Sequence, residues 1–114
     1  MDHWKVTETT DSIVITCSGH DKSGKYAAAA TKFEACVEGR PETFSVIADL
    51  REMTGYESAA RRAWQEAFRR HRRVMEAVVV VGAPSTGIRM GAAVVGAVAG
   101  VPVRFVNDWS EIDG

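Results

Sequence analysis

Two nearly uninterrupted apolar runs, residues 44–50 and 77–81, limit the folds open to this chain more than any other feature. Runs rich in β-branched residues, without polar alternation, are typical of strands buried on both faces of a parallel sheet. Between them, residues 55–74 repeat apolar side chains every three or four positions, the periodicity of a helix with one face on a core. A strand, a helix and a second strand in this order predict a right-handed crossover and a parallel sheet.

The same alternation extends over the rest of the chain. Two β-branched runs at the N-terminus predict a hairpin, which adds an antiparallel edge. The other expected elements are a polar loop at 19–24, a helix after it that is capped by Ser23 and stops at Gly39, a glycine-rich helix at 87–99, a strand at 101–106 and a terminal turn at 107–112. We therefore expect one α/β domain over residues 1–114, of order ββαβαβαβα. Its sheet is mixed and mostly parallel, with about five strands, the run 77–81 in the middle and helices packed on it.

Helix ends carry their own signals. Thr54 with Glu57, and Asp108 with Glu111, have the spacing of a capping box. In a capping box the side chain of each of the two residues accepts a hydrogen bond from the backbone N–H of the other. Ser85 or Thr86 is the expected cap of the glycine-rich helix. The residues of the 55–74 helix that point away from the core are Ser58, Arg62, Gln65, Arg69, Arg72 and Arg73.

Composition excludes several classes of protein. The formal net charge of the 114 residues is −1, so the strong positive excess of a dedicated nucleic-acid binder is missing, and we expect no nucleic-acid partner. Cys17 and Cys36 stand apart from each other and from histidines at ligand spacing, which predicts reduced, buried thiols and no metal or other cofactor. The N-terminus has no apolar signal region, and the longest apolar run is shorter than the about 20 residues of a membrane span. We expect a bacterial-type cytoplasmic protein.

Catalytic patterns are also missing. The segment 82–87, GAPSTG, has the outer glycines of a P-loop, but Ile88 and Arg89 follow where Lys and Ser or Thr are needed. His71 lies on the apolar stripe of its helix and is expected to be a packed, hydrogen-bonded core histidine. An enzyme that uses Asp49 or His71 as acid or base is the least favoured alternative, and we expect no enzyme.

The segments Asp49-Leu50-Arg51 and Glu57-Ser58-Ala59-Ala60, together with the element order, resemble the STAS family, the sulfate transporter and anti-sigma factor antagonist domains. The similarity is greatest to their divergent SpoIIAA-like members and covers the whole chain. In that family a strand ends in D-L-S, and D-S-S-G at the start of a helix carries a serine that a partner kinase phosphorylates. The resemblance therefore implies that Ser58 is a candidate phosphorylation site, although three of the four residues of its motif differ from the family's.

The resemblance implies a non-catalytic regulatory domain that docks a protein partner, such as a kinase-like anti-sigma factor, through the Asp49 loop and the start of the following helix. The residues expected to bind the partner are Asp49, Arg51, Thr54, Glu57, Ser58, Arg61 and Arg62. The alternative is a small-molecule or lipid-binding domain whose ligand lies between sheet and helices. An apolar cavity with few polar groups would favour a ligand, and a filled core with an exposed, concave surface at Asp49 would favour a protein partner.

Two weaker hypotheses concern the surface. Guanidinium groups of Arg69, Arg72 and Arg73, or backbone amides near Ser85 and Thr86, are candidates for holding an anion. A solvated helix face, partly neutralised by Glu57–Arg61 and Glu66–Arg70 pairs, is the favoured alternative. Gly87, Gly91, Gly96 and Gly100 come in pairs spaced by four residues, which indicates close packing of helix on sheet or, as the second choice, a homodimer seam.

Overall fold

The computed structural model describes residues 4–21 and 25–112, as a five-stranded sheet with three α-helices. The strands are β1 (Trp4–Glu8), β2 (Ser12–Asp21), β3 (Phe44–Tyr56), β4 (Met75–Val81) and β5 (Val103–Val106). The α-helices are α1 (Lys25–Glu38), α2 (Ser58–His71) and α3 (Thr86–Ala99), and two short 3₁₀ turns are η1 (Arg72–Val74) and η2 (Trp109–Glu111). The predicted fold class is confirmed, with η2 in the place of the expected last helix.

The strands lie side by side in the order in which they occur along the chain. β1 is antiparallel to β2, and every following neighbour pair is parallel. The expected hairpin edge and mostly parallel sheet are therefore confirmed. The run 77–81 was expected in the middle of the sheet, but β3 occupies the middle and β4 lies between β3 and β5. Both of those strands have neighbours on each side, which explains why both are almost wholly apolar.

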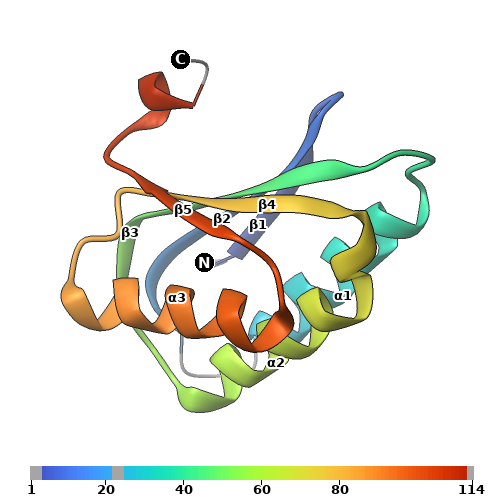
Figure 1. The fold of residues 1–114 in the computed structure, drawn as a ribbon. Coiled ribbons are helices and arrows are strands. Elements are labelled where there is room, and N and C mark those ends of the chain that lie inside the picture. The colour runs from blue at the N-terminus through green and yellow to red at the C-terminus, as the bar shows by residue number, and fades with distance from the viewer. Residues whose placement is uncertain (1–3, 22–24, 113–114) are drawn as a thin grey trace.

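All three helices lie on one face of the sheet (Figure 1). The reason is the handedness of the connections. Each parallel crossover steps one strand further in the same direction, and right-handed crossovers that step the same way place their helices on the same side. The large core is consequently between this face and the helices, with Phe33, Phe44, Ile13, Val46 and Val80 among its fully buried side chains.

The other face of the sheet has a much smaller apolar cluster. Val14, Ile47, Val79, Val81 and Val106 form it, and Trp109 and Ile112 from the C-terminal segment pack against it. Figure 1 shows this segment turning away from β5 on the side opposite the helices.

Two strands run further than the sequence pattern indicated. β2 continues to Asp21, into the first residues of the predicted polar loop, and β3 continues to Tyr56. The extensions pair with each other, Gly19 opposite Met53 and His20 opposite Gly55, so each satisfies the backbone hydrogen bonds of the other. The predicted capping box of Thr54 and Glu57 is therefore wrong. Thr54 is a strand residue, and Glu57 is an N-cap in extended conformation whose side chain accepts no capping hydrogen bond.

The other predicted caps fare better. Ser85 caps α3, because its hydroxyl accepts the backbone N–H of Ile88 at 3.2 Å. Asp108 and Glu111 form the expected capping box around η2. α1 ends directly before Gly39, as predicted, whereas Ser23 lies outside the described residues. Within residues 4–21 and 25–112, no helix has both the length and the apolarity needed to cross a membrane.

The glycines of α3 favour close packing of helix on sheet. A Cβ atom on Gly91 would lie 2.1 Å from Tyr56 Oη, and one on Gly96 would lie 2.0 Å from Val103 Cγ2. Gly100 has a φ of +79° and ends the helix in the left-handed conformation, which suits glycine. On the outer side of α3, Met90 and Val98 are 62% and 56% exposed. The homodimer stays a prediction that light scattering after size exclusion would test.

Candidate functional site

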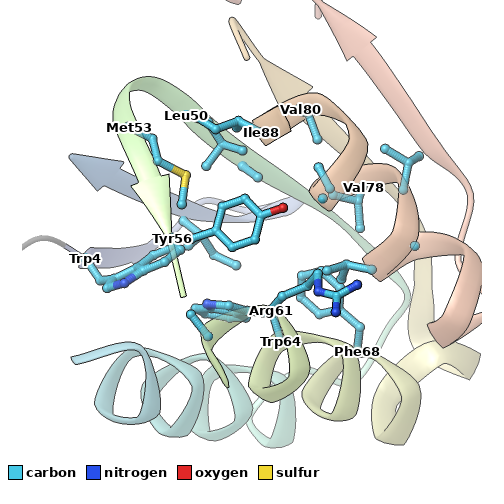
Figure 2. Close-up of a pocket in the computed structure, with 18 residues that line it drawn as sticks. Trp4, Leu50, Met53, Tyr56, Arg61, Trp64, Phe68, Val78, Val80 and Ile88 are labelled. Carbon is cyan, nitrogen blue, oxygen red and sulfur yellow. The ribbon is translucent and has the colours of Figure 1, made fainter. Parts of the chain in front are cut away.

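An apolar cavity of about 90 Å³ lies between the sheet and helices α2 and α3. Figure 2 shows the residues around it. From the strands and the end of β3, the lining residues are Trp4, Ile15, Ala48, Leu50, Met53, Tyr56, Val78, Val80 and Val103. From the helices, they are Ala60, Arg61, Trp64 and Phe68 of α2 and Ile88, Gly91, Ala92, Val95 and Gly96 of α3.

Small side chains explain why this space is not filled. Ala48 on β3 and Ala60 on α2 line the cavity where larger residues would close it, while Gly91 and Gly96 let α3 pack closely against Tyr56 and Val103. Several lining residues, including Tyr56, Arg61 and Ala92, are only half-buried, so the cavity reaches solvent on their side. This combination of an apolar interior and a solvent-accessible side is typical of small-molecule sites.

Aromatic rings form one wall of the cavity. The rings of Trp4 and Trp64 have centroids 5.1 Å apart, and the rings of Trp64 and Phe68 have centroids 5.8 Å apart. Phe33 packs edge-on against both Trp64 and Phe68 from α1 and supports this wall from behind. Rings that are held by one another in this way offer a rigid surface to a planar or aliphatic ligand.

Nitrogen- and oxygen-bearing side chains around the cavity are few: Trp4, Tyr56, Arg61 and Trp64. The Tyr56 hydroxyl donates to the backbone oxygen of Gly87 at 3.3 Å. Trp64 is 6% exposed, and its Nε1 is buried without a hydrogen-bond partner among the described residues. In this part of the chain, no acidic side chain lines the cavity.

The surroundings of Asp49 differ from the partner-docking loop that the sequence suggested. Asp49 is inside β3, is 5% exposed and lies on the face opposite the helices, because its neighbours Ala48 and Leu50 point into the cavity. Its carboxylate accepts from Arg51 Nε at 2.9 Å, Arg51 Nη2 at 2.8 Å and Trp109 Nε1 at 2.9 Å. The expected exposed loop at Asp49 is therefore wrong.

These contacts decide the pKa of Asp49. Burial by itself raises the pKa of a carboxyl group, but hydrogen bonds from the side chains of Arg51 and Trp109 outweigh it and hold the pKa of Asp49 below its ordinary value. Gly82 makes room for this arrangement. It has a φ of +63°, and a Cβ atom there would lie 2.4 Å from Arg51 Cγ.

The residues predicted to bind a partner do not form one surface. Asp49 and Arg51 lie on the face of the sheet opposite the helices. Helix α2, which begins at Ser58, covers the other face. Thr54, Ser58 and Arg62 are exposed, and Glu57 and Arg61 are half-buried. Within residues 4–21 and 25–112, Glu57 and Arg61 make no ion pair, so that predicted pair is absent.

The predicted anion-binding residues are separated as well. Arg72 lies beside Gly100 at the end of α3, whereas Ser85 and Thr86 are at its start. Arg69 is paired with Glu66, and Arg72 donates to the backbone oxygen of Arg69 at 3.1 Å. Arg73 is exposed. The predicted Glu66–Arg70 pair is present at 3.7 Å, which favours a solvated helix face, and anion binding by these arginines stays a prediction.

His71 and the cysteines have structural surroundings. His71 Nε2 lies 2.9 Å from Glu34 Oε2, and the ring packs edge-on against Phe33, which confirms a packed, hydrogen-bonded histidine that joins α2 to α1. Neither Cys17 nor Cys36 is in a disulfide bond. Cys17 is buried as predicted, whereas Cys36 is only half-buried, so the prediction of a buried thiol is wrong there. Among the described residues, no group of three or more histidine, cysteine or acidic side chains is arranged to hold a metal ion.

Sequence reasoning did not locate the cavity, although it named a ligand between sheet and helices as the alternative. Trp4, Tyr56 and Trp64 come from three different elements, and no spacing along the chain relates them. The usable signal was the set of small residues in α3, which indicated close packing of helix on sheet or, as the second choice, a homodimer seam. Gly91 and Gly96 do pack closely, and they also line the cavity.

Comparison with known proteins supports the fold. No protein-family model matches the chain, and no curated protein matches it significantly. Among solved structures, it is similar to an uncharacterised protein of the DUF3478 family with a SpoIIAA-like fold from Shewanella loihica PV-4. The TM-score is 0.71 at 14% identity, and the match covers 95% of this chain and 87% of the other.

Proposed function

We propose that this chain, whose fold is SpoIIAA-like, is a non-catalytic binding protein that holds an apolar small molecule between its sheet and helices α2 and α3. The observation that supports the proposal best is the aromatic and aliphatic cavity itself. Apolar cavities of similar lining and roughly 150 Å³ stay dry and take up benzene. A cavity of about 90 Å³ that reaches solvent suits a short chain or one small ring, with the rest of the ligand outside.

The lining also explains why binding is preferred to catalysis. Acid–base chemistry needs a titratable group within hydrogen-bond reach of the substrate. Among the described residues around the cavity there is no aspartate, glutamate, histidine, lysine or cysteine, and the one phenol, Tyr56, donates to the backbone oxygen of Gly87. The buried carboxylate of Asp49 is on the other face of the sheet, where Arg51 and Trp109 occupy it.

Narrowing the cavity tests this function. Ala92 of α3 lines the cavity, whereas the next residue, Ala93, is exposed and does not. We expect Ala92→Leu to weaken binding of straight-chain alcohols, from butanol to decanol, by about tenfold or more, because the added side chain takes space that the ligand needs. Ala93→Leu is the matched control and should bind as the parent does. Binding is followed by the fluorescence of Trp4 and Trp64, and equal affinity of the two variants would contradict the proposal.

Docking of a protein partner is the second candidate function. It is supported by the exposure of Ser58 at the first residue of α2, next to exposed Arg62. A phosphate on Ser58 would lie at the positive end of the helix. If Ser58→Asp and Ser58→Ala capture the same host proteins with the same affinity, phosphorylation of Ser58 does not control docking.

A further inference from the structure

The polar atoms around the cavity are unusual because those without a partner are donors. Trp64 Nε1 is buried and makes no hydrogen bond within the described part of the chain. An indole N–H only donates, so only an acceptor atom can satisfy it. Buried donors without a partner are rare in folded proteins, because the lost hydrogen bond to water is not replaced.

Arg61 is a second donor group beside the cavity, although its side chain is not fully buried. It is half-buried and lines the cavity from the first turn of α2. Later in the same helix, Arg69 and Arg70 pair with Glu66, and Arg70 also pairs with Glu34. For Arg61 no carboxylate lies within ion-pair distance in residues 4–21 and 25–112. In Figure 2 its side chain extends beside the cavity, along with Trp64 and Phe68.

The surroundings of Arg61 favour a negative charge. Arg61 and Trp64 are three positions apart, so they lie on the same side of α2. The first turn of a helix carries partial positive charge, which adds to that of the guanidinium group. The Tyr56 hydroxyl donates its proton to Gly87, so Tyr56 adds no donor for an anion and the positive charge comes from Arg61 and the helix end. A ligand with an amino group would meet no carboxylate here, whereas an acid would meet two donors.

We infer that the ligand is an anionic amphiphile, a short aliphatic or aromatic carboxylic acid. Its apolar part lies among Trp4, Trp64 and Phe68, its carboxylate pairs with Arg61, and one of its oxygens accepts from Trp64 Nε1. The inference rests on the proposed function, since it assumes that the cavity is occupied, and it adds the chemical class of the ligand.

Acids and alcohols of equal chain length distinguish the proposed binding of apolar molecules from the inferred preference for an anionic ligand. Calorimetric titrations compare the carboxylate and the alcohol of each chain length from butyl to decyl, with the corresponding amine as a third probe. We expect the best acid to bind about tenfold or more tightly than its alcohol, the effect of one charge-assisted hydrogen-bonded pair. The amine should bind more weakly than the alcohol.

Three variants, each checked for folding by its thermal unfolding curve, assign the contacts. Arg61→Gln should bring the ratio of acid to alcohol affinity close to one, whereas Arg62→Gln, which alters the exposed neighbour, should keep the parent's ratio. Trp64→Phe retains a ring but lacks the N–H, and it should weaken acid binding by about fivefold or more. If alcohols bind as tightly as acids, or if Arg61→Gln keeps the preference for acids, this inference is wrong and the proposed function stands. If no acid, alcohol or amine binds, both are wrong.

Discussion

Asp49 shows how a single buried carboxylate connects distant parts of the chain. Its carboxylate accepts hydrogen bonds from Arg51, two residues later in β3, and from Trp109 in the C-terminal turn. Among the described residues, Asp49 is the one charged residue that is buried. A buried charge of this kind is stable only while its partners remain in place. The segment Asp49-Leu50-Arg51, which suggested a docking loop, therefore has a structural role on the face of the sheet opposite the helices.

The lowered pKa of Asp49 gives a pH-dependent contribution to stability. A carboxyl group whose folded pKa is lower than its unfolded pKa stabilises the fold above the unfolded value, about 4, and this stabilisation is lost as the pH falls through the folded pKa. We expect Asp49→Asn to lower the free energy of unfolding by ~1–2 kcal/mol at neutral pH. The difference from the parent, measured by urea unfolding, should shrink as the pH is lowered below 4. A difference that grows in acid would contradict this assignment.

At the scale of elements, the two predicted capping boxes had opposite outcomes. The backbone N–H of Ser110 donates to Asp108 Oδ1 at 2.8 Å, and the N–H of Asp108 donates to Glu111 Oε2 at 3.1 Å. Thr54 instead lies in the extension of β3 that pairs with β2. The same four-residue spacing can therefore belong to a turn or to a strand, and pairing with another strand decides which one forms.

This difference predicts the effect of two substitutions. Asp108→Ala removes the acceptor of the Ser110 N–H, and we expect a clear decrease in the urea midpoint of unfolding. Thr54→Ala removes an exposed hydroxyl that caps no helix. The free energy of unfolding should therefore stay within about 0.5 kcal/mol of the parent's. A larger effect at Thr54 than at Asp108 would show that the first capping box matters after all.

At the scale of the whole molecule, one face of the sheet carries the helices and the other depends on the C-terminal segment. Trp109 and Ile112 cover the small cluster of valines and Ile47 there. Trp109 also donates to Asp49, so this cover is attached by a polar as well as an apolar contact. Without it, a flat apolar patch on a sheet would face solvent, which favours association.

Trp109→Ala should therefore lower the free energy of unfolding by ~2–3 kcal/mol, less than for a fully buried tryptophan because Trp109 is half-buried. Light scattering should also detect self-association. Trp109→Phe keeps a ring on the cluster but loses the hydrogen bond from the indole N–H to Asp49. It should therefore lower the free energy of unfolding by ~1 kcal/mol and cause no more self-association than in the parent. Equal effects of the two variants would contradict the covering role.

Several parts of the structure could be predicted from local pattern. The apolar runs of β3 and β4, the periodicity of α2 and the glycine end of α1 each depend on neighbours in the chain, and all three are confirmed. The mostly parallel sheet followed from their alternation. The extension of β2 and β3 could not be predicted in this way, because its hydrogen bonds join residues such as Gly19 and Met53, which are far apart in the sequence.

The sequence by itself determined the order and type of the elements, because helix and strand periodicities are set within a few residues by side-chain direction along the backbone. Only the tertiary structure decided which face each side chain meets. It turned Asp49 away from α2 and brought Trp4, Tyr56 and Trp64 around one cavity. The physical reason is that cavities and buried ion pairs arise where separate elements pack, and packing depends on the shapes of all of them together.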